Sequence, residues 1–293
     1  MNYQLENDDL HVVFTTKGGG MTSIRDKSGR EYLWQGDSRY WSGQAPVLFP
    51  ICGSLREDRA LTEDGKLVHI PRHGIVRKEE FKLEFVFKDK ICLSIGENES
   101  MLAQYPYRFR LFITYTLKEK QIQVTYGILN EDTANMPFFI GGHPAFNCPL
   151  DSGENYSDYK IVFERKENCT VPAPVTETGL IDMGKRTAML EGSNTLRLSH
   201  DLFKEDAIIF DQLKSRKIKY IHRQEHKGIQ LEFPQFPYVI LWSSGNNGPF
   251  IAMEPWSGLS TCSDEDDVLE HKRNVLIAEP GFLEKLSYSI TVL

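Results

Sequence analysis

Apolar and polar positions alternate with a period of two along most of the chain. Alternation over four to eight residues is typical of half-buried strands, and the segments concerned are rich in Val, Ile, Phe, Tyr and Thr. Turn signals rich in Gly, Asn and Asp separate them, and no amphipathic helix longer than about two turns is evident. The predicted strands are residues 10–15, 80–87, 107–117, 121–130, 160–163, 207–210, 217–221, 228–233, 238–242 and 286–293.

Strands at short spacing without intervening helices predict antiparallel sheets. About twenty strands in one chain must stack as a sandwich or close as a barrel or propeller, and no blade-length repeat favours the propeller. We therefore expect an all-β fold, a large antiparallel β-sandwich that forms one domain over residues 1–293. The least regular segment, 149–186, is predicted to be a long loop with a small hairpin, and 192–203 to hold a short helical turn.

Composition narrows the classes of partner. The 293 residues carry 34 Lys+Arg against 41 Asp+Glu, a formal net charge of −7. This mild acidity, without a basic stripe, argues against a nucleic-acid partner. No apolar run approaches the roughly 20 residues that cross a bilayer, and the polar, acidic N-terminus resembles neither a signal nor a transit peptide. The five cysteines are scattered and form no Cys-x-x-Cys pair, as is usual for reduced thiols, so we expect a cytoplasmic protein. The pattern specifies no oligomeric state.

Three segments place a titratable side chain within a run of apolar or small residues, where burial can perturb a pKa. His73 lies between a proline-containing turn and Gly74. His143 follows an apolar strand that ends in two glycines, whose missing side chains would let a ligand approach. Glu254 ends another apolar strand, and alternation places it on the same face as Phe250 and Ala252. A core histidine with a satisfied hydrogen bond, or a glutamate paired with an arginine, would explain these positions equally.

Two histidines and a glutamate form a set of general acids and bases. The same three side chains could also ligate zinc, as in a metal hydrolase. Pairs of histidines four residues apart, 69 with 73 and 222 with 226, lie in strand or turn context, which weakens a metal site. His-Glu-x-x-His, Gly-x-Ser-x-Gly, P-loop and dinucleotide motifs are absent. We therefore expect no metal and no cofactor.

Five short motifs together resemble the aldose 1-epimerase (galactose mutarotase) family, in its shorter aldose 1-epimerase-like branch. The resemblance covers residues 10–293, and the Gly-His-Pro-x-Phe motif is fairly specific. It implies a large antiparallel β-sandwich that binds a sugar in an open cleft. The motifs, in the family's order, are Phe-Pro-Ile-Cys-Gly at 49–53, Pro-Arg-His-Gly at 71–74, Gly-His-Pro-Ala-Phe-Asn at 142–147, Glu-Pro-Trp-Ser-Gly at 254–258 and Glu-Pro-Gly at 279–281.

The resemblance also implies roles for single residues. Glu254 matches the family's general base and His143 its general acid, while His73 matches a second histidine that hydrogen-bonds the sugar. Asp206 resembles the substrate-binding aspartate, with Asp211 as its competitor.

Other residues are expected to bind the substrate because of their chemistry. Arg72 and Arg77 flank the first histidine, where either could face a phosphate, and we assign both to substrate binding together with Trp256. Trp242, Phe146 and Tyr238 are further candidates for stacking on a sugar ring.

The implied reaction interconverts the α and β anomers of an aldohexose or a related sugar. The glutamate removes the proton of the C1 hydroxyl while the protonated histidine at 143 delivers one to the ring oxygen, so the ring opens, rotates and closes on the other face. The partner is therefore a small-molecule sugar, and the sequence leaves open which sugar and whether it is phosphorylated.

One position departs from the family pattern. Many members carry an arginine after the glycine of the Phe-Pro-x-x-Gly segment, whereas this chain has Ser54. Either Arg56, Arg59 or Arg72 replaces the missing guanidinium or the sugar lies differently. The departure motivates a second hypothesis, a non-catalytic carbohydrate-binding protein of the same fold.

Overall fold

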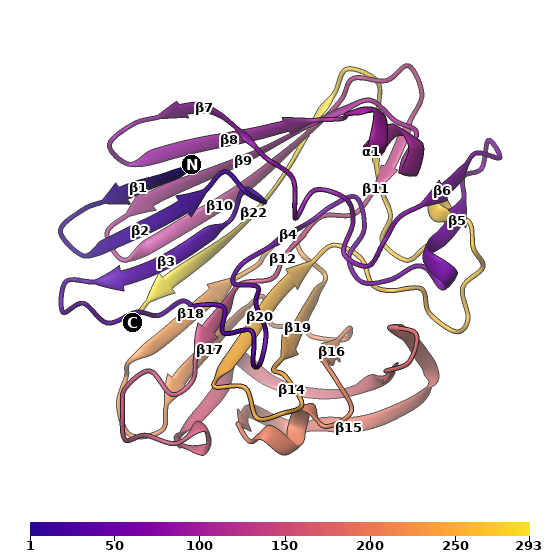
Figure 1. The fold of residues 1–293 in the computed structure, drawn as a ribbon. Helices are drawn as coiled ribbons and strands as arrows, with labels where there is room; N and C mark the ends of the chain where they lie inside the picture. The colour runs from indigo at the N-terminus through magenta and orange to yellow at the C-terminus, as the bar shows by residue number, and fades with distance from the viewer.

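The computed structural model describes all residues, 1–293 (Figure 1). Its strands are β1 (Asn2–Glu6), β2 (Leu10–Thr15), β3 (Met21–Asp26), β4 (Val47–Leu48), β5 (Arg59–Leu61), β6 (Leu67–His69), β7 (Lys82–Val86), β8 (Lys90–Gly96), β9 (Phe109–Lys118), β10 (Gln121–Asn130), β11 (Met136–Phe138), β12 (Gly141–Gly142), β13 (Ala145–Asn147), β14 (Tyr159–Val175), β15 (Leu180–Arg197), β16 (Ile208–Phe210), β17 (Lys217–His222), β18 (Gly228–Glu232), β19 (Tyr238–Trp242), β20 (Phe250–Trp256), β21 (Leu276–Ala278) and β22 (Leu283–Val292). The helices are α1 (Glu99–Gln104) and the 3₁₀ turns Arg56–Asp58, Tyr156–Asp158, His200–Phe203 and Leu269–His271.

Two antiparallel sheets dominate the molecule. The larger has nine strands in the order β15-β14-β17-β18-β22-β10-β9-β8-β7. The smaller has the order β16-β19-β20-β12-β4, with β13 also paired to β20, and lies in the middle of the view in Figure 1. Three small sheets, β1-β2-β3, β11-β21 and β5-β6, complete the fold. The prediction of an all-β, antiparallel sandwich is confirmed.

The alternation of β20 explains how the smaller sheet divides the interior. Ile251 and Met253 belong to the main hydrophobic core, a continuous cluster of 79 buried residues that connects the sheets. Phe250 and Ala252, which alternate with them along the strand, belong to a separate small cluster on the opposite face. Alternation places Glu254 on that second face, as the sequence predicted.

Strand prediction succeeded where alternation is regular and failed where bulges interrupt it. Residues 10–15, 121–130 and 238–242 form β2, β10 and β19 with the predicted bounds. The expectation of a long loop over 149–186 is wrong, because β14 and β15 form a long hairpin that curves along the bottom of Figure 1. Four register shifts between these strands move successive side chains off a strict period of two. The helical turn predicted over 192–203 is confined to residues 200–203, since β15 continues to Arg197.

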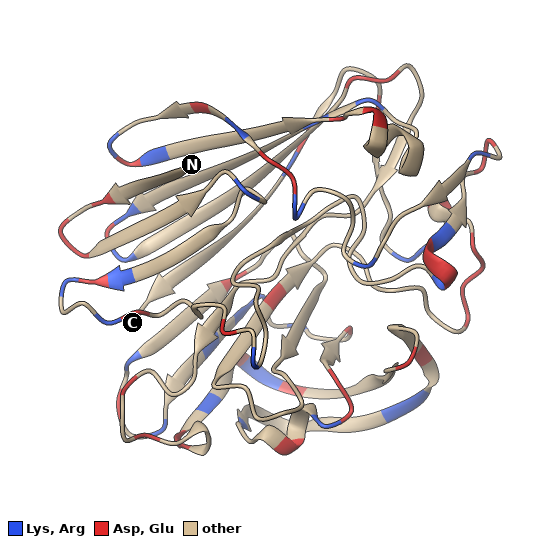
Figure 2. Ribbon diagram, in the orientation of Figure 1, with Lys and Arg blue, Asp and Glu red and all other residues tan.

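Charged residues of both signs are interspersed along the strands and loops of the ribbon rather than gathered into a stripe (Figure 2). Helix is scarce: α1 has six residues, and the side chain of Asn98 caps it by accepting a hydrogen bond of 2.9 Å from the backbone N–H of Met101. None of the helices has the length and apolar character required to cross a membrane.

Candidate active site

All seven residues assigned to the site from the sequence line one cavity of about 260 Å³. Its size lies just below the roughly 300–1,000 Å³ typical of small-molecule sites. The cavity opens on the second face of the smaller sheet, beside β19 and β20. The seven residues are Arg72, His73, Arg77, His143, Asp206, Glu254 and Trp256.

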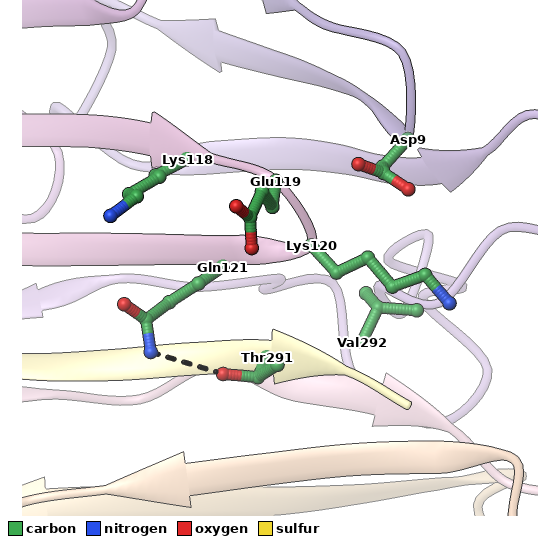
Figure 3. A pocket seen from close by; sticks show the side chains of 7 residues that line it. All are labelled: Asp9, Lys118, Glu119, Lys120, Gln121, Thr291 and Val292. Atoms are coloured by element: carbon green, nitrogen blue, oxygen red, sulfur yellow. Dashed lines mark hydrogen bonds between the residues drawn. The ribbon is translucent and has the colours of Figure 1, made fainter.

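A larger hollow, of about 560 Å³, lies elsewhere, at the turn between β9 and β10 beside the end of β22 (Figure 3). Lysine, acidic and amide side chains line it, with neither a histidine nor an aromatic ring. Two of the side chains drawn there share a hydrogen bond, which runs from Gln121 Nε2 to Thr291 Oγ1 at 3.3 Å. Because it gathers no buried titratable groups, this surface hollow offers no acid–base chemistry.

Backbone pairing between two of the sequence motifs fixes His73. Its N–H donates to the carbonyl of Gly53 (2.7 Å), and the N–H of Gly53 donates to its Nδ1 (3.2 Å). The other ring nitrogen, Nε2, is 3.4 Å from Nε of Arg72, a second N–H donor beside the ring. Gly74 allows the close approach, because a Cβ there would lie 1.9 Å from the carbonyl oxygen of Phe49. Both interpretations of His73 therefore hold: one nitrogen is satisfied by the fold and the ring lines the cavity.

Two residues of the cavity have backbone conformations that are costly for any residue but glycine. His73 has φ 68° and Asp206 has φ 107°. Such conformations cost about 1–3 kcal/mol each and persist where the surrounding structure enforces them, often at functional sites. Their coincidence at one cavity adds an independent sign that it is the functional site.

β20 brings His143 and Glu254 together. β12 and β13 flank the histidine and both pair with β20, and the N–H of Met253 donates to the carbonyl of Pro144 at 3.0 Å. As a result, His143 Nε2 lies 3.3 Å from Glu254 Oε2, with the two residues 7% and 1% exposed. The alternative in which Glu254 pairs with an arginine is not observed, since its one ionic contact is this histidine.

The two glycines before His143 serve packing, not ligand access. A Cβ at Gly141 would lie 2.9 Å from both Cys52 Sγ and Trp256 Cδ1, and one at Gly142 would lie 2.5 Å from the hydroxyl of Tyr288. Protein atoms therefore occupy the space that we expected a ligand to use, and that interpretation is wrong.

Burial shifts all three titratable groups toward their neutral forms. It raises the pKa of Glu254 well above its ordinary value, although the charge of Arg72 opposes the change. Burial lowers the pKa of His143 to about 3, and the charges of Arg72 and Arg77 add to the effect. The pKa of His73 is also far below its usual range, because of burial and then of the neighbouring His143 and the same two arginines.

Three buried polar atoms at the cavity have no hydrogen-bond partner. They are Nδ1 of His143, Oε2 of Glu254 and Nε1 of Trp256. Unpaired buried groups are rare in folded proteins, and each one costs free energy. Their gathering at one cavity indicates a place where a polar ligand completes the hydrogen bonding.

The structure separates the two candidate aspartates. Asp211 accepts two hydrogen bonds from Arg186, at 2.6 and 3.0 Å, away from the cavity. Asp206 lines the cavity, and its Oδ2 is 3.9 Å from Nη2 of Arg72. The guanidinium of Arg77, also in the lining, makes neither an ion pair nor a hydrogen bond, so it is free to meet a ligand.

The tip of the β14–β15 hairpin packs against Ser54, the residue that departs from the family pattern. A Cβ on Gly179 in this tip would lie 2.8 Å from Ser54 Oγ and 3.1 Å from Nη1 of Arg72. Of the three arginines considered as replacements for the family's guanidinium, Arg72 lines the cavity, whereas Arg56 and Arg59 line a different hollow. The geometry thus favours Arg72.

Sequence reasoning missed Trp41, whose indole stacks on His143 with ring centroids 4.7 Å apart. The residue lies in an irregular segment between β3 and β4, so no periodicity marked it. Of the stacking candidates, Trp242 and Trp256 line the cavity. Phe146 and Tyr238 are not among the lining residues and lie in the main core.

Groups of three or more histidine, cysteine or acidic side chains in an arrangement suited to a metal ion are not found.

The chain is similar to known proteins over its whole length. The sequence model of the family described as Aldose 1-epimerase matches residues 1–268. Protein LacX, chromosomal, of Lactococcus lactis subsp. lactis is 49% identical over all of both chains. Among solved structures, a galactose mutarotase related enzyme from Lactobacillus acidophilus superposes with a TM-score of 0.93 at 29% identity, over 100% of this chain and 97% of that one. A galactose mutarotase-like protein from Lactobacillus casei superposes with a TM-score of 0.90 at 25% identity, over 100% of both chains.

Proposed function

Since the chain belongs to the aldose 1-epimerase family, we propose that it is a mutarotase that interconverts the α and β anomers of an aldohexose or a related sugar. The observation that carries the proposal is the buried pair of His143 and Glu254, whose Nε2 and Oε2 atoms are 3.3 Å apart at the cavity. A glutamate and a histidine at this distance can act on the C1 hydroxyl and the adjacent ring oxygen of one pyranose.

The opposite pKa shifts of the pair suit this chemistry. When the pair holds one proton, burial favours neutral His143 with protonated Glu254, because it lowers the pKa of the histidine and raises that of the glutamate. The reactive form is the ion pair reached by proton transfer between them. In that form the imidazolium is a strong acid because its pKa is low, and the carboxylate is a strong base because its pKa is high.

Ring opening then returns the pair to its favoured protonation. The carboxylate of Glu254 takes the C1 hydroxyl proton while the imidazolium of His143 protonates the ring oxygen, and the bond between C1 and that oxygen breaks. The aldehyde rotates, and closure on its other face reverses both transfers. General acid and base groups typically contribute about 10²–10⁴-fold each.

The remaining lining residues suit a polyhydroxylated ring. Nε2 of His73 lies in the cavity 3.4 Å from Nε of Arg72, Asp206 is available as an acceptor, and Trp256 presents an unpaired indole N–H. Arg72 and Arg77 can bind hydroxyl groups or a phosphate substituent.

The test is the rate at which freshly dissolved α-anomers equilibrate, followed by polarimetry over a panel of hexoses and hexose phosphates. The proposal expects acceleration for at least one sugar, in proportion to protein concentration. Rates equal to those in buffer for every sugar would refute it.

A second candidate, a non-catalytic carbohydrate-binding protein, is favoured by Ser54, which departs from the arginine that the family resemblance implies at this position. Calorimetry with the same panel distinguishes the two. A sugar that binds at the cavity without faster equilibration would identify the binding protein.

A further inference from the structure

Three aromatic rings enclose the imidazole of His143, but only one of them meets its face. The rings of Trp242 and His73 approach at 5.6 and 5.7 Å with interplanar angles of 79° and 88°, so both make edge contacts. Trp41 lies at 4.7 Å with an interplanar angle of 26°, which is a stacked arrangement. The face of this indole is therefore the largest surface applied to the imidazole.

The segment that carries Trp41 is tied down although it has no regular structure. The carbonyl of Trp41 accepts a hydrogen bond of 2.8 Å from Nε1 of Trp34, and its N–H donates to the carbonyl of Asp37 at 2.9 Å. The side chain of Asn246 donates to the carbonyl of Arg39 at 2.8 Å, which links the segment to the turn after β19. These bonds hold the indole at a fixed place against the histidine.

An imidazolium at this position has few groups to stabilise it. His143 Nδ1 has no hydrogen-bond partner, and the guanidinium groups of Arg72 and Arg77 repel a positive charge. Glu254 is the one nearby carboxylate in contact. The π face of an indole attracts a cation, and the attraction is stronger where water is excluded.

We propose that Trp41 is a positioning residue for the acid–base pair: its indole face holds the His143 ring with Nε2 toward Glu254 and stabilises the imidazolium form. The inference rests on the proposed function, because the imidazolium is the form that protonates the ring oxygen. It also assigns the indole to the protein's own histidine rather than to the sugar. Trp41 also lines the cavity, but His143 and Phe250, whose ring lies at 5.8 Å and 31° from the same indole, are protein rings already packed against it.

The kinetic test compares Trp41→Phe with Trp41→Leu. Phe and Leu are closer to each other in volume than to Trp, but only Phe keeps a π face, so the pair separates electrostatics from space filling. We expect kcat to fall about threefold in Trp41→Phe and about tenfold in Trp41→Leu, with KM changed less than about twofold. Tyr40→Leu, the same kind of change at the neighbouring position outside the cavity lining, should leave both constants unchanged.

Three outcomes would overturn the proposal. A raised KM with unchanged kcat would make Trp41 a platform for the sugar. Equal losses in the Phe and Leu variants would reduce the indole to filling space. Wild-type constants in both variants would remove any role.

A second measurement does not depend on activity. In protein with ¹⁵N-labelled histidine, NMR titration of the His143 ring should give a higher pKa in Trp41→Phe than in Trp41→Leu, since only Phe stabilises the imidazolium. Equal values would contradict the role of the π face even in an active enzyme. Conversely, if the wild type accelerates no sugar, the proposed function fails while the titration still decides whether Trp41 acts on His143. Thermal unfolding of each variant verifies that the compared proteins are folded.

Discussion

Two glutamates of this protein are almost completely buried, and their surroundings are opposite. Glu167 on β14, 2% exposed, accepts hydrogen bonds from the N–H and the hydroxyl of Ser215, at 2.7 and 2.6 Å, and from the N–H of Lys214 at 3.3 Å. Glu254 on β20, 1% exposed, has an oxygen with no hydrogen bond and a histidine 3.3 Å away.

The difference separates a structural carboxylate from a reactive one. At Glu167 the fold supplies every donor, so the carboxylate stabilises an irregular part of the β14–β15 hairpin. At Glu254 the fold supplies burial without donors, which costs stability. A protein that retains such a cost at one cavity, beside two strained residues, has placed the missing partners on a ligand.

The largest expected effect is that the same substitution removes activity at Glu254 and stability at Glu167. Glu254→Gln removes the base, so we expect the polarimetric rate to fall by about 10²–10⁴ while stability is unchanged or raised. Glu167→Gln replaces one acceptor oxygen by an amide donor that faces donors, so we expect a loss of about 1–3 kcal/mol in urea unfolding with activity retained.

These paired variants control for each other because both change one buried carboxylate to its amide. A Glu254→Gln protein with full activity would reject the assignment of the base. If Glu167→Gln abolished activity while folded, the contrast between the two sites would be lost.

The pH dependence is the next largest effect. Because the pKa of His143 is lowered to about 3, the pair takes up no second proton as pH falls from 7 to 5. We therefore expect no acidic fall of kcat/KM within this range, with the acid limb well below 6.5. On the alkaline side, activity ends when the pair loses its last proton, well above the ordinary pKa of a glutamate. A loss centred at 6.5 would show that His143 titrates normally.

Burial of His143 and Glu254 also makes the free energy of unfolding depend on pH, with opposite signs for the two residues. Unfolded chain binds a proton at His143 below pH 6.5, whereas the folded protein does so only near pH 3, so acid favours unfolding across this window. Glu254 acts oppositely: its raised pKa stabilises the fold below about 4.5, and this contribution is lost as pH rises through the folded value.

Between pH 7 and 5 the unfolded-state titration of the histidine contributes about 2 kcal/mol of lost stability, which Glu254 opposes, so a variant that lacks only the histidine isolates its share. Urea unfolding of wild type and His143→Asn at the two pH values measures it. The wild type should lose about that much more stability than the variant on acidification; equal losses would exclude a neutral buried His143.

Two aspartates show the same contrast between a residue at the cavity and one held by the fold, with smaller expected effects. Asp206 is loosely placed 3.9 Å from Arg72, whereas Asp211 is held by two short bonds to Arg186. We expect Asp206→Asn to raise KM about tenfold without loss of stability, because it removes an acceptor for the sugar. Asp211→Asn should lower stability by about 1–3 kcal/mol and leave KM unchanged, because it leaves Arg186 without its charge partner. Equal KM values for both variants would argue that the sugar does not contact Asp206.

The sequence allowed the main features to be predicted wherever a local pattern encodes them. Alternation identified β2, β10 and β19, and its phase on β20 placed Glu254 on the cavity face. It could not identify the β14–β15 hairpin, because bulges break the period and buried Glu167 reads as a surface residue.

The sequence motifs were enough to predict which residues form the site, but not how these residues contact one another. The motifs identified His73 and His143, yet the pairing of His73 with Gly53 depends on segments 20 residues apart. No local pattern marks Trp41, because it lies in an irregular segment and its role depends on its contact with His143, which is distant in the sequence. The choice between Asp206 and Asp211 likewise required Arg186, a distant partner on β15.

The smallest expected effect concerns two buried indoles. Nε1 of Trp34 donates to the carbonyl of Trp41 at 2.8 Å, whereas Nε1 of Trp256 has no partner. Replacement by Phe leaves a similar cavity at both positions, so the difference between Trp34→Phe and Trp256→Phe isolates the hydrogen bond, worth about 1 kcal/mol. Trp34→Phe should therefore be less stable in urea unfolding by that amount, and Trp256→Phe should raise KM a few-fold because its free N–H is lost to the sugar. If Trp256→Phe were the less stable protein and kept its KM, the unpaired indole would belong to the core, and only His143 and Glu254 would present unpaired atoms to a ligand.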